Sequence, residues 1–168
     1  KPAFMFKNDK KEIETKTYQQ FSDDLDALGT ALNSIGGFDR HIAVIGDNSY
    51  KWITVYITML QSRGVCVPVD KELPPNEIAY ILSNADAEVL FFSKMYADKI
   101  MQIKEQIPTL KYCIALDADE DSEDGSILSY SKLMKSGYKA LDNGDRAFLE
   151  MKPKHETLKM LVYTSGTT

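Results

Sequence analysis

Residues 41–70 read HIAVIGDNSYKWITVYITMLQSRGVCVPVD, and their pattern predicts a strand, a helix and a second strand. The first strand, residues 41–46, has an unbroken apolar core and is followed by a polar turn. Ser49 in this turn is a favourable N-cap for the helix that comes next. Residues 65–69 form the second strand, in which Pro68 favours a position at the edge of a sheet. Apolar strands joined by a helix are typical of a parallel sheet.

The same alternation continues on both sides of this stretch. Before it, residues 17–35 carry apolar side chains at steps of three and four behind a capping box, which predicts an amphipathic helix. After it, we expect helices within residues 74–82 and 96–107, and strands at residues 89–92 and 112–116. This pattern predicts an α/β fold, in which a mostly parallel β-sheet is flanked by helices on both faces.

Three segments interrupt this rhythm. The N-terminal arm, residues 1–16, is expected to contain a short strand. The acidic segment, residues 117–126, is interpreted as a solvated loop and not as a calcium site, because Ser122 and Leu128 stand where an EF-hand loop needs Gly and Glu. Residues 127–151 are expected to form short helices.

Two further expectations concern single side chains. Asp23, Asp24 and Asp26 lie in the first half of the first predicted helix, where the helix dipole favours negative charge, so they are interpreted as solvated charges. Gly137 and Gly144 are expected to break the later helical segment, because glycine is a poor helix former.

The composition is that of a moderately acidic globular domain. The chain has 168 residues, of which 43% are hydrophobic, with a formal net charge of -5 and a pI near 5.1. A chain of this length buries roughly 70% of its unfolded surface, which suits one α/β domain over residues 1–168. The negative charge argues against a basic surface for nucleic acid, so we expect no such partner.

The cysteines and the apolar runs indicate in which cellular compartment the protein is expected. Cys66 and Cys113 lie in apolar strands and are interpreted as buried thiols, which suits a reducing cytosol. No apolar run approaches the ~18 residues of a membrane span and no signal-peptide core opens the chain, so we expect a cytoplasmic protein without a transmembrane segment. Because the sequence begins at Lys1 and not at Met, we expect a processed or trimmed chain, and an upstream segment could carry a targeting address.

The sequence contains no recognisable metal site or hydrolytic triad. His41 and His155 are far apart, and neither has a His or Cys at ligand spacing. Ser165 lacks the Gly-x-Ser-x-Gly elbow of hydrolases, because Tyr163 and Thr167 occupy the two glycine positions. We therefore expect neither a metal ligand nor a catalytic residue within this chain.

The chain ends in a hydroxyl-rich turn after the apolar run 160–162, which predicts a buried strand. The turn consists of Tyr163, Thr164, Ser165, Gly166, Thr167 and Thr168. Hydroxyls and backbone amides donate to phosphate oxygens, and Gly166 can adopt the positive φ that turns successive amides inward. These residues are also common in plain surface turns, but the carboxyl edge of a parallel sheet favours a ligand. The Walker P-loop spacing is absent.

This hexapeptide resembles the phosphate loop of the adenylate-forming superfamily, which includes acyl-CoA synthetases, luciferases and amino-acid adenylation domains. The likeness covers nearly the whole chain from about Thr15. It also rests on Thr17-Tyr18, Asn48-Ser49, Trp52, Gly64, Val67-Pro68-Val69-Asp70, Leu73-Pro74, Glu77, Ile78, Tyr80, Ile81, Leu82 and residues 89–93. Gly166-Thr167-Thr168 leans toward acyl-CoA synthetases, since amino-acid adenylation domains more often show Gly-Ser-Thr.

The resemblance implies a two-step reaction that uses ATP, magnesium and CoA. A carboxylic acid, a fatty acid by general likeness, attacks the α-phosphate of ATP to give an acyl-adenylate and pyrophosphate, and the CoA thiol then takes the acyl group. Positioning and electrostatic stabilisation are the main needs of such transfers. The resemblance also implies that the β- and γ-phosphates, with magnesium, are held by Thr164, Ser165, Gly166, Thr167 and Thr168.

The family pattern continues past this loop with Gly-x-Pro-Lys-Gly, an adenine pocket and a C-terminal domain, none of which is present in this sequence. We therefore interpret the chain as a truncated part of an AMP-binding domain, with residues 163–168 as the start of the phosphate loop, and expect it to be inactive alone. Missing strands would leave an exposed edge that favours self-association. Two alternatives remain open: an amino-acid adenylation domain that loads a carrier protein, and a non-catalytic nucleotide-binding module.

Overall fold

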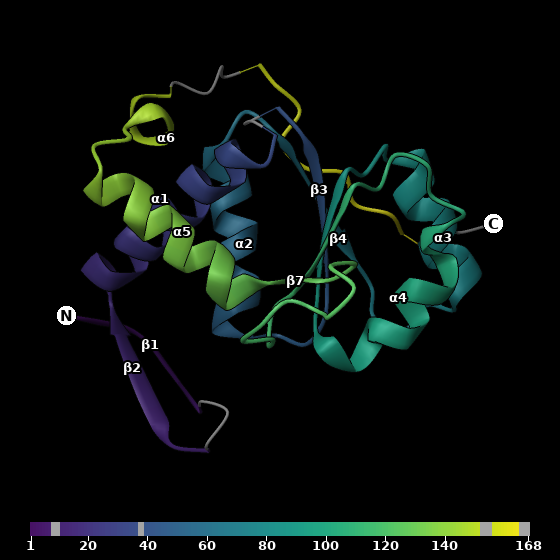
Figure 1. The fold of residues 1–168 in the computed structure, drawn as a ribbon, viewed down its shortest axis with the longest axis horizontal. Helices are drawn as coiled ribbons and strands as arrows, with labels where there is room; N and C mark the ends of the chain where they lie inside the picture. The colour runs from purple at the N-terminus through teal and green to yellow at the C-terminus, as the bar shows by residue number, and fades with distance from the viewer. Residues whose placement is uncertain (8–10, 37–38, 152–155, 165–168) are drawn as a thin grey trace.

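A five-stranded parallel sheet forms the centre of the protein. The computed structural model describes residues 1–7, 11–36, 39–151 and 156–164 (Figure 1). In spatial order the strands are β4 (Val65–Val69), β3 (His41–Ile45), β5 (Val89–Phe92), β6 (Tyr112–Ala115) and β7 (Leu128–Ser129). Every neighbouring pair is parallel, and Pro68 lies in the strand that ends this order, as predicted.

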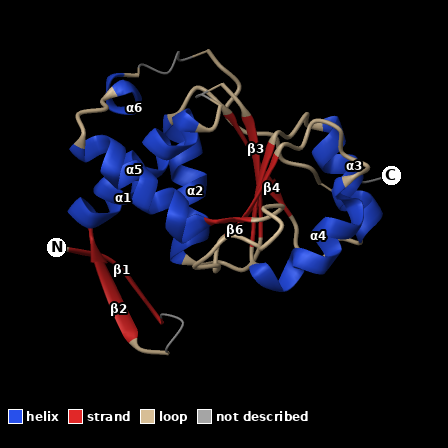
Figure 2. Ribbon diagram, viewed as in Figure 1, coloured by secondary structure: helices blue, strands red, loops and turns tan. Residues whose placement is uncertain are grey.

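Helices cover both faces of this sheet (Figure 2). They are α1 (Tyr18–Ser34), α2 (Tyr50–Gln61) and α5 (Tyr130–Asp142) on one face, and α3 (Pro75–Asn84) and α4 (Ala97–Lys104) on the other. Ile42 and Val44 of β3 pack toward the first group. Ala43 and Ile45 pack toward the second. Burial on both faces explains the unbroken apolar strands, and the predicted α/β fold is confirmed.

Local capping fixes where the helices begin. The Thr17 side chain accepts a hydrogen bond from the Gln20 backbone amide, and the Gln20 side chain accepts one from Thr17, so the capping box of α1 is present. Ser49 Oγ accepts from the Trp52 amide at 3.1 Å and caps α2. Such caps satisfy amides that have no partner inside the helix.

The N-terminal arm is an antiparallel hairpin of β1 (Pro2–Lys7) and β2 (Ile13–Thr17), which confirms the expected strand. Aromatic contacts attach it to the helices. The Phe4 ring meets the Phe21 ring edge-on at 4.8 Å, and Phe6 stacks on Tyr50 at 5.0 Å. Such aromatic pairs add stability beyond the area that they bury.

Gly137 lies inside α5 and does not break it, so that expectation was wrong. A Cβ at this position would lie 1.9 Å from the Ala27 carbonyl oxygen, because α1 and α5 pack closely here. The glycine therefore permits a close helix contact. Gly144 does follow the end of α5, with a φ of +91° that suits glycine, and the short helix α6 (Ala147–Glu150) comes after it.

The remaining described segments differ in part from the sequence prediction. The segment between β5 and α4 is the 3₁₀ helix η1 (Lys94–Tyr96), and the two-residue strand β7 was not predicted. Cys66 and Cys113 are buried free thiols, as expected. In the described part of the chain, no helix has the length and apolar character needed to cross a membrane.

Candidate functional site at the carboxyl edge of the sheet

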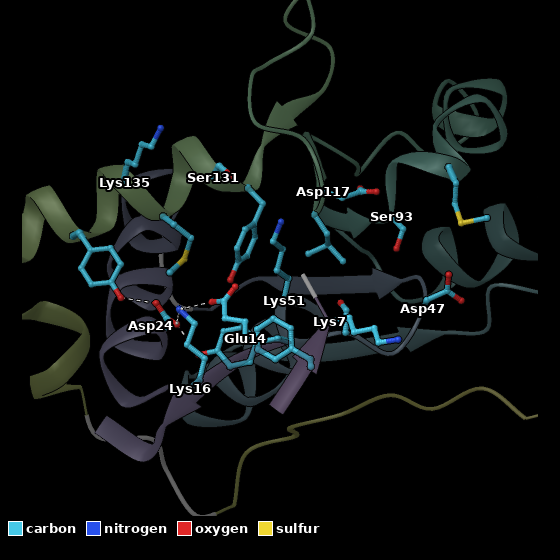
Figure 3. A pocket seen from close by; sticks show the side chains of 18 residues that line it. Lys7, Glu14, Lys16, Asp24, Asp47, Lys51, Ser93, Asp117, Ser131 and Lys135 are labelled. Atoms are coloured by element: carbon cyan, nitrogen blue, oxygen red, sulfur yellow. Dashed lines mark hydrogen bonds and ion pairs between the residues drawn. The ribbon is translucent and has the colours of Figure 1, made fainter. Parts of the chain in front are cut away.

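A cavity of about 590 Å³ opens at the carboxyl ends of β3, β5 and β6 (Figure 3). The turn after β3 contributes Asp47 and Ser49, and the ends of β5 and β6 contribute Ser93 and Asp117. The hairpin, α1, the start of α2, η1 and α5 form the rest of the wall. Ligands of open α/β sheets usually bind at this edge.

The topology explains why the sheet opens here. The helix that follows β3 packs on one face, and the helices before and after β5 pack on the other, so the chain leaves two neighbouring strands in opposite directions. Such a switch point leaves a crevice between the loops. At its base the loops nearly touch, since a Cβ on Gly46, whose φ is +156°, would lie 2.4 Å from Ser93 Oγ.

Asp24 of α1 is a buried carboxylate on the cavity wall, which corrects the prediction of a solvated charge. Its side chain accepts hydrogen bonds from the Tyr50 and Tyr138 hydroxyls, both at 2.5 Å, and lies 3.6 Å from Lys16 Nζ. Only 8% of the residue is exposed, because α1 lies between α2 and α5. Burial, with a further contribution from Asp24, raises the pKa of the Tyr50 hydroxyl, which therefore stays protonated and donates.

Thr164 is the described member of the predicted phosphate-binding set, and it does not line this cavity. Ser165, Gly166, Thr167 and Thr168 lie outside the described residues, and Thr164 is exposed. The predicted buried strand at residues 160–162 is wrong, because only one bridge, between Met160 and Cys66, joins it to β4, and Val162 is 58% exposed. The run is only partly buried: Met160 accepts a hydrogen bond from the Tyr56 hydroxyl of α2, and Leu161 packs against the core on the side of α3.

The described end of the chain instead lies beside α3. The Tyr163 hydroxyl donates to Asn84 Oδ1 at 2.7 Å, and Asn84 is the last residue of α3. Since α3 returns from the carboxyl edge of β4 to the amino edge of β5, its last residue is remote from the cavity (Figure 1). The described end of the chain, up to Thr164, therefore lies apart from the cavity wall.

The acidic loop uses its carboxylates to organise its own backbone. Asp121 accepts from the Ser129 amide at 2.8 Å, and Asp124 accepts from the Ser122 hydroxyl and the Ser126 amide. No cluster of three or more His, Cys, Asp or Glu side chains within the described ranges could hold a metal ion. His155 lies outside those ranges.

The cavity was missed by sequence reasoning for a physical reason. Asp24 meets Tyr50 and Tyr138 across 26 and 114 positions of the chain, and no local pattern indicates such pairs. The Asp47-Asn48-Ser49 turn at the end of a predicted strand was the available signal, because the strand end marks the ligand-binding edge.

Comparison with known proteins finds sequence relatives that are named as CoA ligases and as a bacitracin synthase. It is 28% identical over 155 residues to 4-hydroxybutyrate–CoA ligase 2 of Metallosphaera sedula, covering 90% of this chain and 28% of the relative. It is 25% identical over 158 residues to a long-chain-fatty-acid–CoA ligase of Thermus thermophilus, covering 94% and 27%. It is also 29% identical over 153 residues to bacitracin synthase 1 of Bacillus licheniformis, covering 90% and 2%.

A solved structure has the same fold as this chain. The A-PCP didomain of carboxylic acid reductase from Segniliparus rugosus, in complex with AMP, superposes with a TM-score of 0.77 at 14% identity over 96% of this chain and 27% of that chain. The chain thus spans little more than a quarter of the length of the acyl-CoA ligases that it matches. Because the match to the family described as AMP-binding enzyme extends over residues 1–168, the chain belongs to that family.

Proposed function

We propose that this chain is part of an ATP-dependent acid–thiol ligase, which activates a carboxylic acid as an acyl-adenylate and transfers it to CoA. The family match over all 168 residues is the observation that carries the proposal. The relatives named as CoA ligases support CoA as the acceptor. A fatty acid is the proposed acid class, and it rests on the Thermus thermophilus relative.

The proposed chemistry consists of two displacements. A carboxylate oxygen forms a bond to the α-phosphorus of ATP while the bond to the bridging oxygen of the leaving pyrophosphate breaks. The CoA sulfur then bonds to the acyl carbon, AMP leaves, and the thiol proton passes to solvent. We assign Thr164, Ser165, Gly166, Thr167 and Thr168 to the phosphate oxygens of ATP, where hydroxyls and amides would stabilise the leaving group.

The residues present suit a phosphate-bound magnesium ion better than one held by protein carboxylates. No cluster of acidic or imidazole ligands exists in the described part of the chain, and Thr164, the described member of the turn, exposes its side chain. Magnesium commonly keeps several waters and binds through substrate phosphates with few protein ligands. A hydroxyl-rich turn is compatible with that arrangement.

The test is carboxylate-dependent exchange of pyrophosphate into ATP, measured over a panel of short to long fatty acids, aryl acids and amino acids. The assay uses the full natural protein and, in parallel, the 168-residue chain. We expect exchange with fatty acids by the full protein and none by the 168-residue chain. Exchange by the shorter chain would refute the inactivity proposed for it, and no exchange by the full protein with any acid would refute adenylate formation.

Variants of the turn test the assigned residues separately. Thr167→Ala should lower exchange at least about tenfold, since removal of one donor to a developing charge typically costs a factor of 10²–10³. Ser136→Ala is the matched control, because Ser136 is an exposed residue of α5 whose hydroxyl donates to the Leu133 carbonyl of the same helix. Equal exchange by both variants would remove the turn from the proposal.

An amino-acid adenylation domain is the second candidate. Bacitracin synthase 1, a relative at 29% identity, favours it, and the same exchange assay decides between the two. Exchange with amino acids alone would assign the chain to a carrier-loading protein. ATP binding without exchange would support a non-catalytic nucleotide-binding module.

A further inference from the structure

The described segment 156–164 forms the outer edge of the main sheet, where it passes β4 on its way to α3 (Figure 1). Two backbone hydrogen bonds of 2.9 Å attach it to β4, from the Cys66 amide to the Lys159 carbonyl and from the Leu161 amide to the Cys66 carbonyl. Lys159 and Leu161 thus turn their backbone groups toward β4, and the residues between and after them turn theirs outward. Within the described residues, no strand pairs with this outward side.

Side-chain exposure alternates along the whole of this segment. Each even-numbered residue from 156 to 164 is exposed, and each odd-numbered residue is partly buried. A period of two is that of an extended strand, whose side chains point to alternate faces. Leu161 and Tyr163 pack on the α3 side of the sheet, whereas Met160 accepts a hydrogen bond from the Tyr56 hydroxyl of α2. The segment is therefore extended beyond its single bridge and presents two distinct faces.

The exposed side chains of this edge are apolar. Leu158, Met160 and Val162 are 54%, 37% and 58% exposed. Natural edge strands are commonly protected from pairing by lysine or proline. Lys159 is the single charged residue of the stretch 158–164, and its ammonium donates inward to the Ser62 carbonyl. Two copies of this edge can therefore approach each other without facing like charges.

We propose that this edge is an interaction surface for a second copy of the chain, which pairs residues 158–164 antiparallel about a two-fold axis. The same edge serves both copies, because outward amides and carbonyls of one strand meet those of the other. The register centred on Leu161 sets Met160 opposite Val162 on one face and Lys159 opposite Tyr163 on the other. It therefore joins apolar side chains and keeps the two lysines apart. The pairing needs no nucleotide, so it does not depend on the proposed ligase function.

The first measurement is sedimentation equilibrium of the 168-residue chain at concentrations from about 5 to about 500 µM. A contact along one short edge buries less than the roughly 1,200 Å² of a stable interface, so we expect a weak dimer with a Kd on the order of 100 µM. A monomer throughout this range would overturn the proposal. Growth beyond the dimer would also overturn it, because pairing about a two-fold axis uses the edge completely.

Matched substitutions locate the contact, and circular dichroism verifies that each variant is folded. Val162→Lys places a charge on the apolar edge and should weaken the dimer at least about tenfold. Val162→Pro removes one outward amide hydrogen without touching the bonds to β4, and should weaken the dimer as well. Met5→Lys is the control, because Met5 is 70% exposed on β1 and lies outside the edge segment. Equal Kd values for Val162→Lys and Met5→Lys would overturn the proposal.

Cysteine cross-linking with copper phenanthroline tests the register. The two copies of residue 161 face each other with Cα atoms about 4.5 Å apart, so Leu161→Cys should form a covalent dimer. The two copies of residue 162 lie about 8 Å apart, beyond the roughly 7 Å limit of a disulfide, so Val162→Cys should form none. The wild-type chain, whose described thiols are buried, is the blank.

Two cross-linking results would refute this pairing. One is a covalent dimer of Val162→Cys without one of Leu161→Cys, which would require a different register. The other is the absence of a covalent dimer in both variants, together with protection of the amides of Met160 and Val162 from hydrogen exchange. That result would assign the outward side of the edge to another part of the same chain.

Discussion

Replacement of Asp24 by alanine tests whether this residue joins three elements of the fold. The wild-type carboxylate accepts two hydroxyl hydrogen bonds, and bonds to charged groups contribute about 1.5–3 kcal/mol each. Tyr138 is 38% exposed, so its hydroxyl can bond to water instead in the variant. The ion pair with Lys16 adds about 0–1 kcal/mol because Lys16 is partly exposed. We expect the free energy of unfolding to fall by about 2–4 kcal/mol.

The assay is urea unfolding, followed by the fluorescence of Trp52, the single tryptophan of the chain, and by circular dichroism. Asp23→Ala is the matched control, since Asp23 is only partly buried on the same helix and accepts from the Gln19 side chain at 2.8 Å. This control should lose no more than about 0.5 kcal/mol. A double-mutant cycle with Tyr138→Phe isolates one hydroxyl contact. Equal effects of Asp23→Ala and Asp24→Ala would refute the reasoning.

Three further predictions follow from packing and charge. Gly137→Ala should lower the free energy of unfolding by about 1–3 kcal/mol, because the added Cβ overpacks the contact between α5 and α1. Ser136→Ala, the control, should change this free energy little. A Gly137→Ala variant more stable than the wild type would contradict the close contact of the two helices. Burial raises the pKa of the Cys66 thiol to about 12, so a thiol reagent at pH 8 should react with it slowly until urea is added, and rapid native reaction would argue against burial. The hydrogen bond from Lys111 lowers the pKa of Glu88 below its ordinary 4.5. The stabilisation from the Glu88 carboxylate is therefore present above pH 4.5 and is lost as the pH falls through the lower pKa of the folded state. Glu88→Gln should flatten this part of the curve of unfolding free energy against pH, and an unchanged curve would contradict the prediction.

The sequence predicted those elements whose determinants are local. The capping box at Thr17, the cap at Ser49 and the periodic apolar stripes placed the helices that cover the sheet. The continuous apolar character of β3 and β5 predicted a sheet buried on both faces, because residues facing either helix layer must be apolar.

The errors arose where distant parts of the chain decide the outcome. Gly137 resembles a helix break in isolation, but its missing Cβ is explained only by the Ala27 carbonyl of another helix. Asp24 resembles a solvated charge until α2 and α5 cover it. The apolar run at residues 160–162 resembles a core strand, yet it lies beside β4 at the end of the strand order and is only partly buried. Sequence periodicity reports which residue types alternate, but not which elements become neighbours.

The two candidate ligand regions depend on different parts of the fold. The cavity wall is built from the hairpin β1–β2, from α1, α2 and α5, and from the segments that follow β3, β5 and β6. Residues 159–161 join β4 through two backbone hydrogen bonds of 2.9 Å at Cys66, and Tyr163 adds one side-chain bond to Asn84. Changes in this terminal segment therefore leave the cavity wall intact.

This separation decides how binding data on the protein should be interpreted. A variant of the hydroxyl-rich turn that abolishes pyrophosphate exchange should leave the cavity wall unchanged, because the cavity shares no described side chain with the segment that precedes the turn. Coupling between the two sites would require an interaction free energy that the described contacts do not supply.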